Sequence, residues 1–199
     1  IQRQHPWVFS GAIERILIDE DKEDLADGEI VKVVANDGSF LALGHFHNGS
    51  IAVRIFSFEN VSPTPKFWEE KVKNAIAYRK TIGLFDSKET TTYRLIHAEG
   101  DGFSGLIVDV YGNVAVYQAH SIGMHKVRTE IASAIINASE GKITAIYDKS
   151  AETLPPEYAA TIENGYLIGK HEGKQVVKEH GVLFEIDWVS GQKTGFFID

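Results

Sequence analysis

The stretch IVKVVANDGSFLALGHFHNGSIAVRIF, residues 30–56, decides the fold of the N-terminal part of the chain. It holds three apolar runs, at 30–35, 40–46 and 51–56, which are typical of strands. The turn-forming sequences Asn36-Asp37-Gly38 and Asn48-Gly49 separate these runs and favour hairpin connections. Short strands joined by tight turns predict a compact β-barrel of about 60 residues.

Downstream of the barrel, the pattern predicts a mixed domain. Ser62-Pro63-Thr64-Pro65 marks the boundary, with Thr64 as a helix cap and Pro65 as the first residue of a helix that Gly83 ends. A second amphipathic helix is expected at 124–138. Strands are expected at 92–97, 105–111, 114–119, 143–147, 166–169, 175–178 and 182–186. The predicted class is therefore α+β, with domains at 1–64 and 65–187 and a short third segment at 188–199.

Composition restricts the classes of function. The net charge of −8 argues against strong general affinity for nucleic acid, but much of the acid is concentrated in residues 19–29, which leaves room for a local basic groove. Cysteine is absent, so the chain can form no disulfide, thiolate metal site or cysteine nucleophile. No apolar run approaches the length of a membrane helix and no signal peptide begins the chain, so we expect a cytoplasmic protein.

Three motifs are interpreted as structural. Gly100-Asp101-Gly102-Phe103-Ser104-Gly105 fits the dinucleotide pattern GxGxxG, but a β-branched run follows it where a helix is required. His45 and His47 are two apart, which on a strand places both on one face, but too few further ligands are evident to predict a metal site. Asp148-Lys149-Ser150 suggests a Ser–Lys pair, although adjacency alone gives no catalytic geometry, and we interpret it as a turn.

Two groups of residues are candidates for binding. Arg54, together with Arg3, His5 and Trp7, could bind RNA by combining phosphate contacts with stacking. The alternative is that Trp7 fills the barrel and Arg54 is simply solvated, and composition favours this second interpretation. Near the C-terminus, Gln192, Lys193 and Thr194 cluster donors in a glycine-flanked loop that suits an anionic ligand.

The final stretch, residues 189–199, is an unusual ending for a globular chain. The apolar residues Phe196, Phe197 and Ile198 are typical of a strand in a packed sheet, yet they are followed only by Asp199. We therefore expect that the sequence is an N-terminal piece of a longer protein.

Three segments resemble one known family in the family's own order. Residues 5–13 are similar to the start of the PUA domain in class I S-adenosylmethionine-dependent methyltransferases that modify cytosine C5 in 23S ribosomal RNA. Residues 94–109 resemble that family's central-domain signature, and residues 191–199 resemble the segment at which its catalytic domain begins.

The resemblance implies an RNA-binding PUA-like barrel, a small strand–strand–helix–strand–strand domain and a stub of a Rossmann-like methyltransferase domain. It also implies that ribosomal RNA is the partner and that S-adenosyl-L-methionine is the cofactor; a homodimer is left open. From the sequence itself we expect neither a membrane nor a metal partner. Positions lining the cofactor pocket would be Gln192, Lys193, Thr194, Gly195, Phe196 and Asp199.

The catalytic cysteine of this family and most of its cofactor site have no counterpart here, so no catalytic residue is predicted. Without a thiolate to add at C6 of cytosine, we expect the 199-residue chain itself to be inactive. Two alternatives stay open. One is a stand-alone PUA-type RNA-binding or ribosome-assembly module, and the other, weaker one is a pseudouridine-type RNA enzyme that shares only the PUA part.

Overall fold

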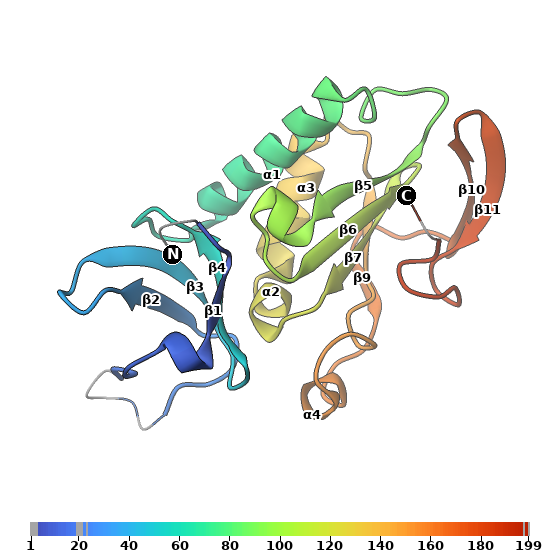
Figure 1. Ribbon diagram of the computed structural model, residues 1–199. Coiled ribbons are helices and arrows are strands. Elements are labelled where there is room, and N and C mark those ends of the chain that lie inside the picture. The colour runs from blue at the N-terminus through green and yellow to red at the C-terminus, as the bar shows by residue number, and fades with distance from the viewer. Residues whose placement is uncertain (1–3, 19–21, 23, 197, 199) are drawn as a thin grey trace.

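The computed structural model describes residues 4–18, 22, 24–196 and 198 (Figure 1). From the N-terminus, the described chain forms a four-stranded sheet, a long helix, a five-stranded sheet with helices on one face, and a hairpin that leads into the C-terminal segment. The residues Arg3, Phe197 and Asp199, to which binding or strand roles were predicted, lie outside the described residues. Within them, no helix combines the length and the apolar character that crossing a membrane requires.

The N-terminal sheet contains the three predicted strands and one more. All its pairs are antiparallel, in the order β1-β4-β3-β2. Its strands are β1 (Trp7–Phe9), β2 (Ile30–Val34), β3 (Phe40–Phe46) and β4 (Ile51–Ser57). Among the described residues β1 and β2 are both edge strands and do not pair, so the hydrogen bonding gives an open sheet where we predicted a barrel. The core of this sheet is formed by Val8, Ala42, Val53 and Ile55.

Helix α1 (Pro65–Thr81) begins and ends where the sequence predicted. Pro65 supplies the fixed φ of a first helical residue, and Gly83 follows the helix in the left-handed region, with φ of +76°. The Thr64 side chain makes no capping bond, and its backbone oxygen instead accepts from Trp68 N. Trp68 is 1% exposed and anchors the helix in the main core.

The central sheet has the order β5-β6-β7-β8-β9. Its strands are β5 (Thr92–His97), β6 (Leu106–Tyr111), β7 (Val114–Ala119), β8 (Ala145–Asp148) and β9 (Gly165–Ile168). The pair β7–β8 is parallel, and the others are antiparallel. Three strands therefore precede the helices, one more than the strand–strand–helix–strand–strand order allows, because the turn at Gly112 adds β7 to the β5–β6 pair.

The parallel pair requires a crossover, and the predicted helix at 124–138 supplies it in two pieces. These are α2 (Ile122–Lys126) and α3 (Arg128–Ala138), which are interrupted at Val127. Three short helical elements were not predicted: the 3-10 turns η1 (Ser10–Ala12) and η2 (Ala98–Asp101) and helix α4 (Pro156–Ala159).

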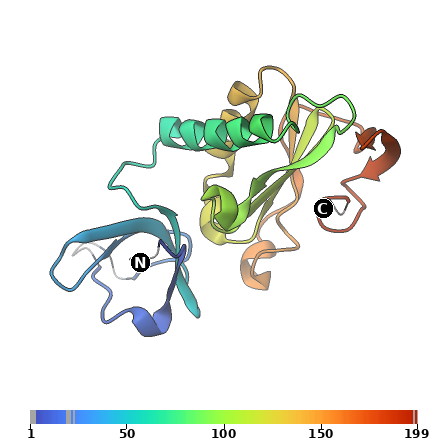
Figure 2. The ribbon, with the colours of Figure 1, turned by 45° about the horizontal axis from the view of Figure 1, so that its top comes forward.

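Alternation along β6 separates two cores. Leu106, Val108 and Val110 belong to the cluster shared with α1 and α3, which cover one face of the sheet (Figure 2). On the other face Tyr111 packs with Trp188, whose ring is 4° from parallel to it. This second face also receives the hairpin formed by β10 (Lys174–Glu179) and β11 (Val182–Asp187). The C-terminal segment is therefore held on the side of the sheet that the long helices leave uncovered.

Candidate functional site

The short edge strand β1 carries an aromatic cluster beside a cation. The Trp7 ring lies 5.9 Å from the His5 ring and 6.4 Å from the Phe9 ring, both edge-on. The Arg54 guanidinium carbon lies 5.8 Å from the Trp7 ring centroid, and Trp7 pairs directly with Arg54 in the sheet. Phe9 is 49% exposed. Exposed rings next to a guanidinium are the combination that binds single-stranded nucleic acid through stacking and charge.

Trp7 also joins the two parts of the chain. Its indole Nε1 donates to the Glu99 carboxylate at 2.8 Å, and Ser104 Oγ donates to the same oxygen. Burial opposes ionisation of Glu99, but these hydrogen bonds outweigh it and lower the pKa of the carboxyl. The interpretation that Trp7 fills the core of the N-terminal sheet is wrong, because Val8 occupies that core while Trp7 bridges to η2.

The structure thus brings together three of the four residues predicted to bind RNA: His5, Trp7 and Arg54. Arg3 lies outside the described residues. Sequence reasoning missed Phe9, although its spacing of two from Trp7 on a strand places both side chains on one face.

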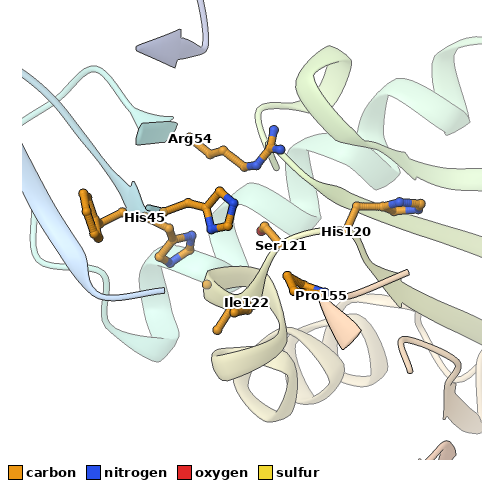
Figure 3. Close-up of a pocket in the computed structure, with 9 residues that line it drawn as sticks. His45, Arg54, His120, Ser121, Ile122 and Pro155 are labelled. Atoms are coloured by element: carbon orange, nitrogen blue, oxygen red, sulfur yellow. The ribbon is translucent and has the colours of Figure 1, made fainter. Parts of the chain in front are cut away.

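A small pocket opens where the N-terminal sheet meets the segment between β7 and α2 (Figure 3). Its volume is about 40 Å³, enough for a few water molecules but too small for a nucleotide base. The side chains of His45 and Arg54 extend from β3 and β4 toward Ser121, and His120 lies on its other side (Figure 3). The pocket is lined by His45, Phe46, His47, Arg54, His120, Ser121, Ile122, Gly123 and Pro155.

His45 is the most unusual member of this pocket. The residue is 2% exposed, and neither ring nitrogen has a hydrogen-bond partner among the described residues. Burial, assisted by the nearby Lys126 charge, lowers the pKa of His45 to about 4. The ring stays neutral at physiological pH and keeps one unused N–H donor.

The contact between His45 and α2 requires a glycine. A Cβ added to Gly123 would lie 2.1 Å from His45 Cγ, so a side chain at 123 cannot coexist with the histidine in this position. His47 instead pairs with Asp27 at 2.9 Å. The two histidines therefore have separate roles, and the described residues contain no cluster of three or more metal-ligating side chains.

His120 is an exposed residue on which the charges of two arginines act. Burial of the ring lowers its pKa, and the charges of Arg54 and Arg94 lower it further. Arg94 is paired with buried Asp109, with Nε to Oδ1 at 2.8 Å, while its own side chain stays 32% exposed.

The glycine-flanked loop near the C-terminus is fixed to the central sheet by Thr194. The threonine is 2% exposed, and its Oγ1 donates to Asp109 Oδ2 at 2.7 Å. Tyr111 OH lies 2.9 Å from the same hydroxyl and also accepts from Phe196 N at 3.2 Å. With its hydroxyl used in this way, Thr194 acts as an anchor and is not available to a ligand.

The rest of this loop is more accessible. Gln192 and Lys193 are exposed, whereas Gly195 and Phe196 are half-buried. Lys149 reaches from the end of β8 to donate its ammonium to the Gly191 carbonyl, and burial lowers the pKa of this lysine. The predicted cofactor residues from 192 to 196 are thus held against the sheet, and Asp199 lies outside the described part of the chain.

Two motifs are confirmed as structural. The GxGxxG segment contains η2 and leads into strand β6, and its Asp101 forms a buried ion pair with Arg79. In the Asp148-Lys149-Ser150 turn, Ser150 donates to Asp148 and accepts from Ala119 N, while Lys149 points to the C-terminal loop. The serine and the lysine therefore form no nucleophile–base pair.

Residues 1–58 match the PUA-like domain family. Over its whole length the chain is 34% identical to ribosomal RNA large subunit methyltransferase I of Aliivibrio fischeri strain ES114, of which it covers 49%. It is 32% identical to the protein of that name from Alteromonas mediterranea, covering 48%. The chain thus spans about half the length of the curated relatives it matches.

Two solved structures share the fold. One is SMU.776, described as a methyltransferase and crystallised with SAH, with a TM-score of 0.73, 19% identity, and coverage of 94% of this chain and 44% of that one. The other is described as a SAM-dependent methyltransferase from Streptococcus mutans, with the same TM-score and identity and coverage of 94% and 45%. Both support the mixed α+β architecture, whose PUA-like first part is identified by the family match over residues 1–58.

Proposed function

We propose that this chain is the RNA-recognition part of a cytoplasmic, S-adenosylmethionine-dependent methyltransferase that modifies cytosine C5 in large-subunit ribosomal RNA. The similarity over the full length of the chain to ribosomal RNA large subunit methyltransferase I supports the class of reaction and the partner. The structural observation that carries RNA recognition is the cluster of His5, Trp7 and Phe9 beside Arg54 on the PUA-like domain.

In this proposal, His5 and Phe9 offer exposed rings for base stacking and Arg54 offers charge to the backbone, with Arg3 as a further cation from the sequence. Stacking on an aromatic ring contributes about 1–3 kcal/mol per base in such sites. Because the net charge is −8, we expect the association to be weak and sensitive to salt.

The loop from Gln192 to Phe196, with Asp199, is proposed to form one wall of the methyl-donor site. Two exposed polar side chains, Gln192 and Lys193, fit contacts to a polar ligand. Thr194 does not fit such a contact, and we assign it a positioning role through Asp109. When bound, the donor would supply the methyl group. The residues of this chain would orient it.

The chain alone is proposed to be inactive. Activating cytosine C5 by a thiolate requires a cysteine, and this sequence has none. Methyl transfer to ribosomal RNA by the 199-residue chain would therefore contradict the cysteine-dependent chemistry.

RNA recognition is tested by titrating the chain into a labelled, short single-stranded fragment of large-subunit ribosomal RNA at low and high salt. We expect binding that weakens as salt rises, whereas salt-independent binding would contradict phosphate contacts. Cytosine C5 specificity is tested by bisulfite sequencing of large-subunit RNA from cells with and without the gene. One protected cytosine should become convertible on deletion, and an unchanged pattern would exclude this target.

A further inference from the structure

We infer that the junction pocket is a phosphate-binding subsite for single-stranded RNA, shared between the PUA-like sheet and the segment 120–123 after β7. This inference rests on the proposed function and adds to it a specific site and two residues that the aromatic cluster does not include. The subsite would hold one backbone phosphate against Arg54, His45 and His120.

The first argument is the unused hydrogen-bonding capacity of His45. Buried polar groups are nearly always paired, and an unpaired one requires an explanation such as an absent ligand or water. His45 lines the pocket and is only 2% exposed. Neither of its ring nitrogens has a hydrogen-bond partner among the described residues. A phosphate oxygen in the pocket would accept the N–H that this neutral ring carries.

The second argument is charge. Arg54 lines the same pocket and is half-buried, and this burial lowers the pKa of its guanidinium. The Glu99 carboxylate nearby is already engaged by Trp7 and Ser104. A guanidinium in this position retains donors for an anion, and phosphate is the anion whose geometry it matches.

The third argument is size and position. A volume of about 40 Å³ admits the oxygens of a phosphate but excludes a base, so the pocket would bind the backbone while bases lie outside. Trp7, in contact with Arg54, places the aromatic cluster next to that backbone position. One nucleotide could therefore be stacked on β1 while its phosphate is bound at the junction.

The test compares RNA affinity for matched variants by fluorescence anisotropy over a range of salt. Arg54→Gln should weaken binding by about tenfold or more, as expected for one charge-assisted contact, and reduce the slope of log K against log salt by about 0.7. His120→Gln should weaken binding about two- to fivefold, as for a neutral hydrogen bond. Lys32→Gln removes the same charge from an exposed position on β2 and should change affinity by less than about twofold.

A second readout uses the histidine ring signals in NMR spectra of the intact chain. Adding RNA should shift the signals of His45 and His120 and leave His180, on the distant hairpin turn, unchanged. If wild type binds RNA but the His45 and His120 signals do not respond, the subsite is wrong and the proposed function stands. If the Arg54 and Lys32 variants share one salt slope, Arg54 makes no phosphate contact, and both the subsite and the proposed role of Arg54 in RNA recognition are wrong. If wild type binds no RNA at low salt, both fail. Arg54→Lys, which keeps the charge, should keep the slope and so shows that any loss in Arg54→Gln is not misfolding.

Discussion

Thr194 Oγ1 donates to Asp109 Oδ2 at 2.7 Å, and this bond joins the C-terminal loop to the centre of the sheet. Asp109 is 0% exposed and is also paired with Arg94, so the carboxylate depends on both donors. Thr194→Val should remove one charge-assisted hydrogen bond and lower the free energy of unfolding by about 1.5–3 kcal/mol. Urea denaturation measures this change, and amide exchange of residues 191–196 should accelerate.

Thr194→Ser is the matched control because it retains the hydroxyl. It should remain within about 1 kcal/mol of wild type, the small loss reflecting one methyl group. Equal destabilisation by serine and valine would mean that packing of the methyl group, and not the bond to Asp109, holds the loop.

The glycine at 123 is predicted to be irreplaceable while His45 is present. Gly123→Ala places a Cβ 2.1 Å from His45 Cγ, so the histidine or α2 must move. We expect a loss of about 1–3 kcal/mol, typical of overpacking, measured by thermal or urea unfolding. The double variant with His45→Ala should recover part of this loss, and a double variant with no recovery would argue against a direct clash. Gly11→Ala, at a position with no atom within 4 Å of the added Cβ, is the control.

His45 should make the protein sensitive to acid. Its pKa falls from about 6.5 in the unfolded chain to about 4 in the folded one, so between these values the unfolded state binds more protons. Stability contributed by the neutral ring is complete above about pH 6.5 and is lost as the pH falls toward 4, by up to about 3 kcal/mol.

His45→Phe, which cannot titrate, should flatten this part of the stability–pH curve measured by urea denaturation. His180→Gln, at an exposed position, should leave the curve unchanged. A histidine-to-phenylalanine variant with the wild-type pH dependence would show that other groups cause the acid sensitivity.

Phe9 should contribute to RNA binding without contributing much to folding. The ring is 49% exposed and stands beside Trp7, so Phe9→Ala should weaken RNA binding by about 1–3 kcal/mol through lost stacking. Its free energy of unfolding should change by less than about 1 kcal/mol. Val176→Ala, at a similarly exposed position on the distant hairpin, should affect neither quantity.

Much of the fold could be predicted from local signals. The Asn–Gly and Asn–Asp–Gly turns placed the strands of the first sheet, and Pro65 and Gly83 placed α1, because these residues act through their own backbone preferences. The break at Val127 and the open seam between β1 and β2 could not be predicted, because both depend on packing between segments distant in sequence. The three strands before the helices were predicted from their own apolar runs, and only the strand–strand–helix–strand–strand order that the resemblance implied was one strand short.

The candidate site was predicted unevenly. Residue type and spacing were enough to select Trp7, Arg54 and the loop around Thr194. Their partners Glu99 and Asp109 were not selected, because a carboxylate that lies 92 or 85 residues away leaves no periodic signal. The sequence selected His45 together with His47. That the His45 ring is buried without a hydrogen-bond partner could not be predicted, because it depends on how distant segments pack around it.

The hydrogen bond between Trp7 and Glu99 also has an optical consequence. The chain has three tryptophans, and each lies in a different environment: Trp7 at the junction, Trp68 in the main core and Trp188 against the C-terminal segment. Variants that retain one indole at a time would give intrinsic fluorescence signals for junction opening, core melting and release of the C-terminal segment. The order in which the chain comes apart can thus be followed without any added label.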